Sequence, residues 1–421
     1  MPIGNPDGSL EGKMFRPPTG GRDLLPLDVV QKRWIEDRLE DVFHRWGYHR
    51  IITSTVETMD TLMAGGAIER IEVIELQMNQ LGGQRLGLRP ELTASIARAA
   101  VTRLASVTYP QRLYYNANVF RRSAKGSQGG QQEYHQAGIE LLGSSGLMAD
   151  AEVLLLIADC LRALKLSETH IVLGEAALTY SLLSPFPESQ REKIRQSIAE
   201  LDRVAIEELG LSADLQTLAL RLMDLRGTPA EVFEKLSAFE LDEGQRAIAS
   251  QLKSLIELLK VERDQGTQVP DVILDLSLIR PFDYYTGIVF EVVGNGQRVG
   301  QGGRYDDLLS VYDPMPENTG FPGIGFVLNI ERLHKELVPS GSLPQETPPS
   351  DWLIVPTSEA AAGAALAYAQ KARQSANVVR VELSLELSRA ADDVRAIARK
   401  RNISRIAWIS AEGLPDIELV N

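Results

Sequence analysis

The stretch EYHQAGIELLG, residues 133–143, carries the clearest structural signal in the chain. In an extended strand the even-numbered positions share one face and the odd-numbered positions the other: Tyr134, Gln136, Gly138 and Glu140 against His135, Ala137, Ile139 and Leu141. Gln136 and Glu140, on a face made roomy by Gly138, predict the polar floor of a small-ligand pocket. The alternative is the solvated face of a sheet edge.

A second strand precedes this one. Residues 111–121 alternate with the same period of two, and the polar, glycine-rich segment RSAKGSQGGQQ at 122–132 separates the two runs. The pair predicts an antiparallel hairpin. Arg121 ends the first strand, where its guanidinium could offer a bidentate fork to a carboxylate or a phosphate.

The rest of the chain predicts an α+β fold with an antiparallel sheet and helices. A wide apolar face recurs at helical spacing in residues 27–46, residues 147–165 are helical, and an all-helical insertion covers about 183–266. Strands return from 271, with a hairpin turn at GNGQRVG (294–300). We therefore expect a core at 1–337, a Pro/Ser/Gly-rich linker at 338–350, and a small α/β domain with a probable parallel sheet at 351–421.

Composition excludes several classes of protein. The formal net charge of −13 argues against a broad grip on nucleic acid, and the last domain balances nine Lys or Arg against nine Asp or Glu. No secretory signal or long apolar run occurs, so we expect a cytoplasmic protein without membrane spans. The single cysteine, Cys160, predicts a buried core thiol. The five histidines show no ligand spacing, and neither a metal nor a cofactor is expected.

Three further segments carry candidate site residues. LRPELTA (88–94) places Glu91 and Thr93 where a strand runs into a helix, so that a carboxylate could meet an ammonium group there. Taken alone, this segment is an ordinary helix start. RPFDYYTGIVFEVV begins at Arg280 and contains Tyr284 and Tyr285, and QGGRYDDLL (301–309) contains Tyr305.

These segments, in this order, resemble histidyl-tRNA synthetase, a class II aminoacyl-tRNA synthetase. RPFDYY and QGGRYD look like its two histidine-recognition motifs. GGRDLLP (20–26), the helix and strand that follow it, FRR…HQAGIE and GFVLNIERL match the further motifs, from about residue 15 to 335. The resemblance implies a class II synthetase-like core and a truncated final domain that resembles an anticodon-binding domain.

The resemblance also implies a histidine site. In it, the amino group and imidazole are surrounded by Glu91, Thr93, Gln136, Glu140, Tyr285 and Tyr305, with Tyr284 beside them; Arg121 and Arg280 face the carboxylate or an adjacent phosphate. Carboxylates suit an ammonium and an imidazole N–H, and tyrosines supply flat walls with polar tips.

The ATP side departs from the synthetase pattern. The adenine-binding glutamate is replaced by Ser123, and two loop arginines that help to bind ATP phosphates are replaced by Gly130 and Gln132. Arg332 of the last motif remains. Adenylation needs positive charge at the phosphates, so the pattern indicates a retained histidine pocket beside an eroded ATP site.

This combination resembles a paralogous family, the regulatory subunits of ATP phosphoribosyltransferase. The resemblance implies a non-catalytic chain that pairs with a short-form catalytic subunit in a hetero-oligomer around a dimeric core. That complex performs the first step of histidine biosynthesis under feedback control by histidine. Two alternatives stay open at this point: a divergent histidyl-tRNA synthetase, and a stand-alone histidine sensor or tRNA-binding scaffold.

Overall fold

The computed structural model describes residues 17–66, 68–77, 84–122, 130–278, 284–313, 321–375, 378–387 and 389–420. The chain divides into two compact units, Met1–Pro344 and Gln345–Asn421. The division falls within the proline-rich segment 338–350. Each unit is described by itself below.

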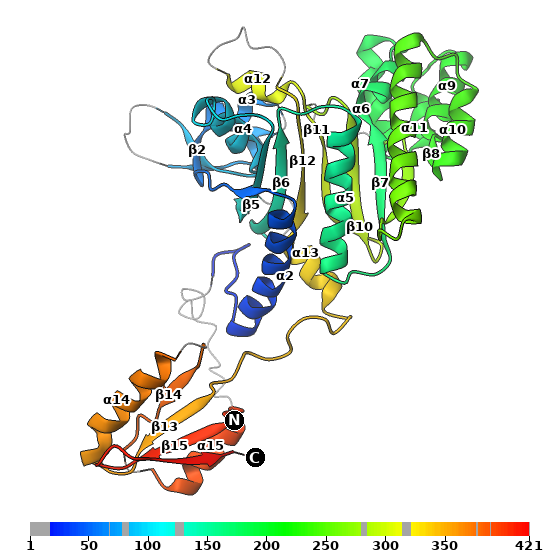
Figure 1. The fold of residues 1–421 in the computed structure, drawn as a ribbon. Helices are drawn as coiled ribbons and strands as arrows, with labels where there is room; N and C mark the ends of the chain where they lie inside the picture. Colours follow the sequence, from blue (N-terminus) through cyan, green and yellow to red (C-terminus); the bar gives the residue numbers. More distant parts are fainter. Residues whose placement is uncertain are drawn as a thin grey trace, which may run out of the picture. The chain divides into compact units, whose positions relative to one another are not determined.

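A nine-stranded sheet forms the centre of the first unit, in the order β1-β5-β6-β12-β11-β10-β7-β9-β8 (Figure 1). Neighbouring strands from β5 through to β7 run antiparallel, whereas β1 runs parallel to β5 and β9 parallel to β7. The strand bounds are β1 His49–Arg50, β5 Gln111–Phe120, β6 Glu133–Leu142, β7 Thr169–Glu175, β8 Arg226–Gly227, β9 Asp271–Asp275, β10 Ile288–Gly294, β11 Gln297–Arg304 and β12 Gly323–Asn329.

Both predicted hairpins are confirmed. β5 and β6 pair along their full length, from Gln111 opposite Leu142 to Phe120 opposite Glu133. β10 and β11 are joined by Asn295 and Gly296, both with positive φ (49° and 75°), as a two-residue turn of the primed type requires.

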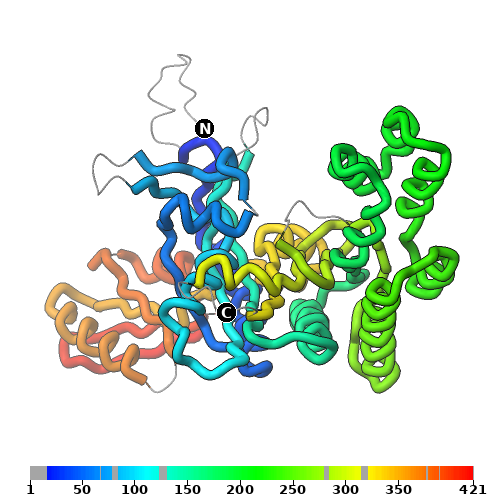
Figure 2. Tube along the Cα trace, turned by 90° about the horizontal axis from the view of Figure 1, so that it is seen from above, coloured from blue at the N-terminus to red at the C-terminus, as the bar shows by residue number. Residues whose placement is uncertain are grey.

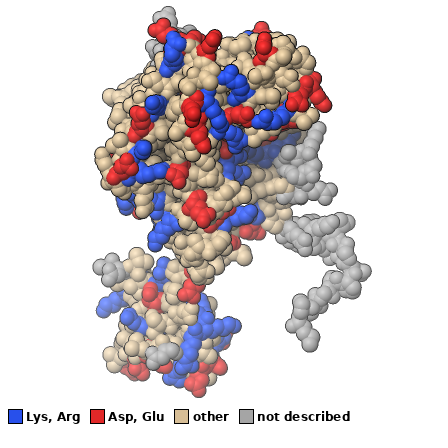
Figure 3. Space-filling view, turned by 90° about the vertical axis from the view of Figure 1, so that its right-hand side faces the viewer, with Lys and Arg blue, Asp and Glu red and all other residues tan. Residues whose placement is uncertain are grey.

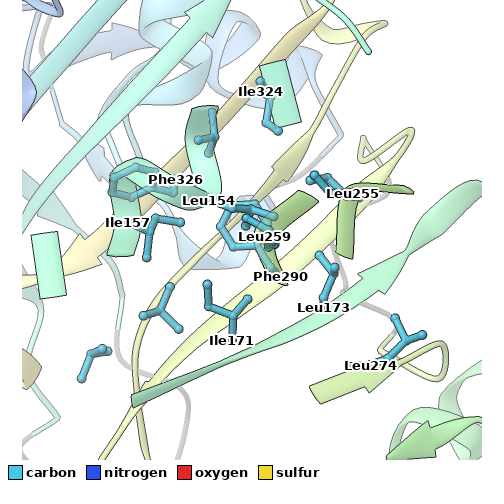
Figure 4. Close-up of a cluster of buried hydrophobic side chains, with 14 of the residues drawn as sticks. Leu154, Ile157, Ile171, Leu173, Leu255, Leu259, Leu274, Phe290, Ile324 and Phe326 are labelled. Carbon is cyan, nitrogen blue, oxygen red and sulfur yellow. The ribbon is translucent and has the colours of Figure 1, made fainter. Parts of the chain in front are cut away.

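One face of the large sheet carries the main hydrophobic core. The helices α2 (Pro26–Arg45), α5 (Leu147–Ala163) and α13 (Ile330–Leu337) contribute to it, and α5 buries Leu154, Ile157 and Cys160 completely. Figure 4 shows Leu154 and Ile157 beside Phe290 and Phe326 of the sheet. Full burial of such side chains stabilises the fold by about 1.5–3 kcal/mol each. Cys160 is the buried core thiol that the sequence predicts.

The opposite face carries a smaller core. Here α4 (Thr93–Thr102) and α12 (Leu308–Tyr312) pack against the sheet through Ile96 and Leu309. Beside them lie α3 (Met59–Ala64), the 3-10 turn η1 (Arg70–Glu72) and a three-stranded sheet of β2 (Val56–Thr58), β4 (Leu86–Leu88) and β3 (Ile74–Leu76). This face holds the candidate site.

The insertion forms a separate group of helices beside the sheet (Figure 2). Its helices are α7 Glu188–Ala199, α8 Arg203–Glu208, α9 Ala213–Met223, α10 Pro229–Ser237 and α11 Glu243–Asp264, and α6 Ala176–Leu182 precedes it. The prediction of an all-helical insertion was wrong in one respect, because Arg226–Gly227 forms β8, antiparallel to β9. Two residues between helices are too few for alternation to reveal a strand.

The second unit is a small α/β domain. Its elements are β13 Trp352–Pro356, the 3-10 turn η2 Glu359–Ala361, α14 Ala362–Arg373, β14 Val381–Leu383, α15 Ala391–Lys400, β15 Arg405–Ile409 and β16 Pro415–Leu419. β14, β13 and β15 are parallel, as expected. The sequence did not predict β16, which adds an edge strand antiparallel to β15 and makes the sheet mixed.

Among the described residues, no helix is long and apolar enough to cross a membrane, and no cluster of three or more His, Cys, Asp or Glu could hold a metal ion. On the face shown in Figure 3, basic and acidic side chains are interspersed.

Candidate functional site

A pocket opens on the central strands β6, β12 and β11, on the face that α4 covers. Eight of the nine residues predicted for the histidine site line it: Glu91, Thr93, Arg121, Gln136, Glu140, Tyr284, Tyr285 and Tyr305. They come from β6, β11, the start of α4, the end of β5 and the segment before β10. Segments more than 200 residues apart in the sequence therefore meet here. The ninth, Arg280, lies outside the described residues.

Glu140 is the centre of the hydrogen-bond network. Its Oε1 accepts a bond from Thr93 Oγ1 at 2.8 Å, and its Oε2 accepts one from the Tyr305 hydroxyl. Glu140 and Tyr305 are both only 2% exposed. These two bonds fix the carboxylate from α4 on one side and from β11 on the other.

Glu91 has a structural role as well as a place in the pocket. Its Oε1 accepts a bond from the backbone N–H of Ala94 at 2.8 Å, and its Oε2 accepts one from the N–H of Thr93. It thereby satisfies two of the free N–H groups at the start of α4. A carboxylate has about four lone-pair sites, so capacity for a ligand remains.

Glycines on neighbouring strands give the pocket its depth. A Cβ at Gly325 would stand 1.9 Å from Glu140 Oε2. Three tyrosine rings lie over glycines in the same way: Tyr115 over Gly138, Tyr285 over Gly303 and Tyr305 over Gly323, each with a ring atom 2.3–2.7 Å from where a Cβ would stand. The small residues in QGGRY and QAGIE thus make room for the buried polar groups.

Burial sets the electrostatics of the pocket. It raises the pKa of Glu140 to about 8, despite the hydrogen bonds from Tyr305 and Thr93, which lower it. Burial also raises the pKa of Glu91, and the pKa values of the Tyr115, Tyr284 and Tyr305 hydroxyls lie well above their ordinary range for the same reason. Two carboxyls that resist ionisation in an enclosed space favour a cationic ligand group.

The pocket is nearly closed. Its side chains leave a free volume of about 40 Å³, which is room for a few water molecules. The rings of Tyr284 and Tyr285 lie 4.7 Å apart, and Tyr284 meets Tyr305 edge-on at 5.8 Å. A ligand as large as an amino acid would enter only if some of these side chains moved.

A second, arginine-lined pocket adjoins the first and shares Arg121, Gln136 and Gln301 with it. Arg298 and Arg332 also line this second pocket. Arg298 pairs with Glu291 at 3.1 Å, and Arg332 donates a hydrogen bond to the carbonyl of Arg298 at 2.9 Å. Burial lowers the pKa of both guanidiniums, and Arg298 and Arg121 lower that of Arg332 further. Three guanidiniums thus line this pocket, and their positive charge suits an anion.

Of the positions predicted to be eroded, the two that the structure describes, Gly130 and Gln132, line neither pocket. Gln132 donates its N–H to the Gly20 carbonyl at 2.9 Å, and its side chain packs against Gly20, as does the carbonyl of Gly130. Gly20 has a φ of 89° and no space for a Cβ there. Ser123 lies outside the described residues.

Sequence reasoning missed two polar residues of the site. Gln301 lines both pockets, and Tyr115 lines the first pocket, with its ring against Gly138. Period-two alternation backward from Tyr305 would have placed Gln301 on the same face. Tyr115 gave no comparable signal, because its neighbour Tyr114 points into the main core. Arg304 has a structural role on the opposite face, where it pairs with Asp150 and with Asp306 at 3.0 Å.

The fold and the motif order define a class of protein. Residues 20–333 match the family model described as histidyl-tRNA synthetase. A histidyl-tRNA synthetase structure from Nostoc sp. superposes with a TM-score of 0.75 at 20% identity, over 96% of this chain and 97% of that one, which shows the shared fold. A crystal structure described as an ATP phosphoribosyltransferase regulatory subunit/histidyl-tRNA synthetase, from Bacillus halodurans, gives a TM-score of 0.77 at 28% identity, over 94% of this chain and 98% of that one.

Full-length relatives narrow the class. The ATP phosphoribosyltransferase regulatory subunit of Nostoc sp. is 56% identical over 97% of this chain and 100% of its own length. That of Nostoc punctiforme is 57% identical over 96% of this chain and 99% of its own. The chain therefore belongs to the family of ATP phosphoribosyltransferase regulatory subunits, with a core of the histidyl-tRNA synthetase type. Its function is that of a non-catalytic regulatory subunit in histidine biosynthesis.

Proposed function

We propose that this chain senses histidine in the pocket around Glu140 and transmits the bound state to a short-form catalytic subunit of ATP phosphoribosyltransferase in a cytoplasmic hetero-oligomer. The observation that carries the proposal is the retained pocket. Two carboxyls, the buried Glu140 and the half-buried Glu91, lie with Gln136 in one pocket, and Arg121 lies at its border with the arginine-lined pocket.

Histidine matches these groups by chemistry. Its ammonium and its imidazole N–H are donors for the carboxylates, and its carboxylate is an acceptor for a guanidinium fork. Arg121 donates Nε to the Pro90 carbonyl at 3.0 Å, which holds the side chain beside the start of α4. A ligand that satisfies both carboxyls would also relieve the electrostatic cost of their burial.

The nearly closed pocket supports a sensing role. Because about 40 Å³ is too little for histidine, binding selects an arrangement in which the tyrosine walls have moved. Tyr305 belongs to the segment that leads from β11 into α12, and Thr93 begins α4. A ligand that binds the open arrangement more tightly would therefore shift elements on the surface of the first unit, which is the differential affinity that allosteric control needs.

We also propose that the core of the complex is a dimer of this chain. Apolar side chains remain exposed at the start of α2 and on the segment that follows β1: Leu25 64%, Val29 37%, Ile52 81% and Val56 37%. Such a set suits burial against a second copy. The segment GGRDLLP (20–26), with the helix and strand that follow it, resembles a synthetase motif and includes this set of residues, which supports a dimer.

A ligand series in calorimetry tests histidine sensing. L-Histidine should bind, histidinol, which lacks the carboxylate, should bind more weakly, and imidazole, which lacks both polar ends, weakest of the three. Equal affinities for histidine and histidinol would remove Arg121 from the site. Absence of histidine binding, both to the chain alone and to its complex with the catalytic subunit, would refute the sensing proposal.

A further inference from the structure

The strand β16 of the second unit leaves one edge of the small sheet open. It is the last strand in the order β14-β13-β15-β16, and it is the reddest strand of Figure 1, next to the end marked C. Among the described residues no strand pairs with its outer side. An open edge presents free backbone N–H and C=O groups to a further strand.

The hydrogen bonds show which groups face outward. Val420 donates its N–H inward to Ser404 O at 3.0 Å, and Leu414 accepts inward from Ser410 N at 3.1 Å. Backbone groups alternate along a strand, so the N–H and C=O of Ile417 and Leu419 face away from β15. These groups make β16 competent to accept another strand.

Ile417 and Leu419, and Leu414 just before the strand, carry exposed apolar side chains. Leu414 is 70% exposed, Ile417 50% and Leu419 67%, although Ala407 and Ile409 beside them on β15 are fully buried. Natural proteins usually blunt an open edge with charge, proline or a bulge. Here Pro415 stands at the first position, and the outward positions after it are apolar.

The other face of β16 is acidic, and this charge limits which strands could pair with it. Asp416 and Glu418 alternate with the apolar residues along the strand. Glu418 forms an ion pair with Arg395 at 2.7 Å, whereas Asp416 has none within the described part of the chain. A second copy paired antiparallel about Ile417 would set Asp416 opposite Glu418, and an in-register parallel copy would set each acid against itself. Like charges directly opposite destabilise a strand pair, so self-pairing in these two registers is disfavoured.

We propose that β16 is a docking edge for an extended segment of the catalytic subunit, in which apolar residues alternate with Lys or Arg. The added strand continues the sheet, its apolar side chains cover Ile417 and Leu419, and its cations face Asp416 and Glu418. This inference rests on the proposed pairing of the two subunits.

Substitutions in β16 can block the docking edge and leave the fold intact. Ile417→Pro removes one outward N–H that β15 does not use, and proline is tolerated at sheet edges. The pair Ile417→Lys and Leu419→Lys keeps every backbone group but replaces the apolar side chains with cations, which the apolar residues of a docked strand could cover only by desolvating them. Leu366→Lys with Leu385→Lys is the matched control, because both leucines are exposed (58% and 92%) and lie away from β16.

The experiment measures the affinity of the full-length chain for the catalytic subunit by analytical ultracentrifugation, with thermal melting of each variant alongside. We expect both β16 variants to bind at least tenfold more weakly and the control to bind like the unchanged chain. If Ile417→Pro melts at a lower temperature than the unchanged chain, the affinity of the double lysine variant alone tests the docking edge. Unchanged affinity of the lysine pair would overturn the docking edge and leave the proposed function standing. Failure of the unchanged chain to bind would refute both.

Discussion

Thr93 Oγ1 donates a hydrogen bond to Glu140 Oε1 at 2.8 Å, which ties the first residue of α4 to the centre of β6. With the bond from Tyr305 on the other oxygen, it makes Glu140 the point where three elements meet. The properties of this one buried carboxyl therefore connect the stability of the fold to the occupancy of the pocket.

The stability of the ligand-free chain should depend on pH through Glu140. The folded-state pKa, about 8, lies above the ordinary value of 4.5. Stability from the protonated form is therefore fully present below 4.5 and is lost as the pH rises through 8. We expect the melting temperature to fall between pH 5 and pH 8, and Glu140→Gln to flatten that fall.

Glu175→Gln is the comparison for this titration. Burial raises the pKa of Glu175 to about 7, so its contribution is lost over a window that ends about one unit lower. Melting curves at unit steps from pH 5 to pH 9 separate the two. An identical pH slope in Glu140→Gln and the unchanged chain would show that Glu140 is not the titrating group.

Gly325→Ala should close the pocket. The new Cβ would meet Glu140 Oε2 at 1.9 Å and the Ile139 carbonyl at 2.5 Å, so Glu140 must move. We expect a loss of about 1–3 kcal/mol in the free energy of unfolding and loss of histidine binding, by denaturant titration and calorimetry. Gly363→Ala, with open space around it in α14, should change stability by less than about 1 kcal/mol. Full histidine affinity in Gly325→Ala would place the ligand elsewhere.

Arg121→Gln should discriminate between ligands. Charged hydrogen bonds contribute about 1.5–3 kcal/mol, so the affinity for histidine should fall roughly 10- to 150-fold. The affinity for histidinol, which has no carboxylate, should change far less. Arg122→Gln is the control, because Arg122 is exposed and does not line the pocket. A parallel loss for both ligands would mean that Arg121 acts through the structure of the pocket.

The chain should not activate histidine with ATP. Gly130 and Gln132 stand where the synthetase pattern has arginines, and Gln132 packs against Gly20 instead of facing a pocket. We expect no histidine-dependent exchange of pyrophosphate into ATP above background, with a histidyl-tRNA synthetase as the positive control. A rate within a hundredfold of that enzyme would show that Arg121, Arg298 and Arg332 suffice for adenylation.

Local patterns in the sequence were enough for much of the fold and the site. Alternation in residues 133–143 correctly separated the pocket face of β6 from its core face, since Gln136 and Glu140 line the pocket whereas Ile139 and Leu141 join the main core. The motif order then gave Glu91, Thr93, Tyr284, Tyr285 and Tyr305, but not Tyr115 or Gln301.

Long-range pairing could not be read in the same way. Alternation does not reveal that β12 lies between β6 and β11, and it is that order which puts Gly325 under Glu140. The short strands β8 and β16 were missed because two to five residues with mixed polarity carry little periodic signal. The closure of the pocket depends on tyrosine positions that only the packed structure fixes.

Phosphoribosyltransferase activity under histidine titration tests the central claim most directly. The catalytic subunit is assayed alone, with the unchanged chain, and with Glu140→Gln, and Glu133→Gln on the same strand outside the pocket is the control. We predict that the chain activates the catalytic subunit, that histidine inhibits the complex, and that Glu140→Gln raises the inhibitory concentration at least tenfold while Glu133→Gln leaves it unchanged. An inhibition curve that is the same with and without this chain would contradict the account.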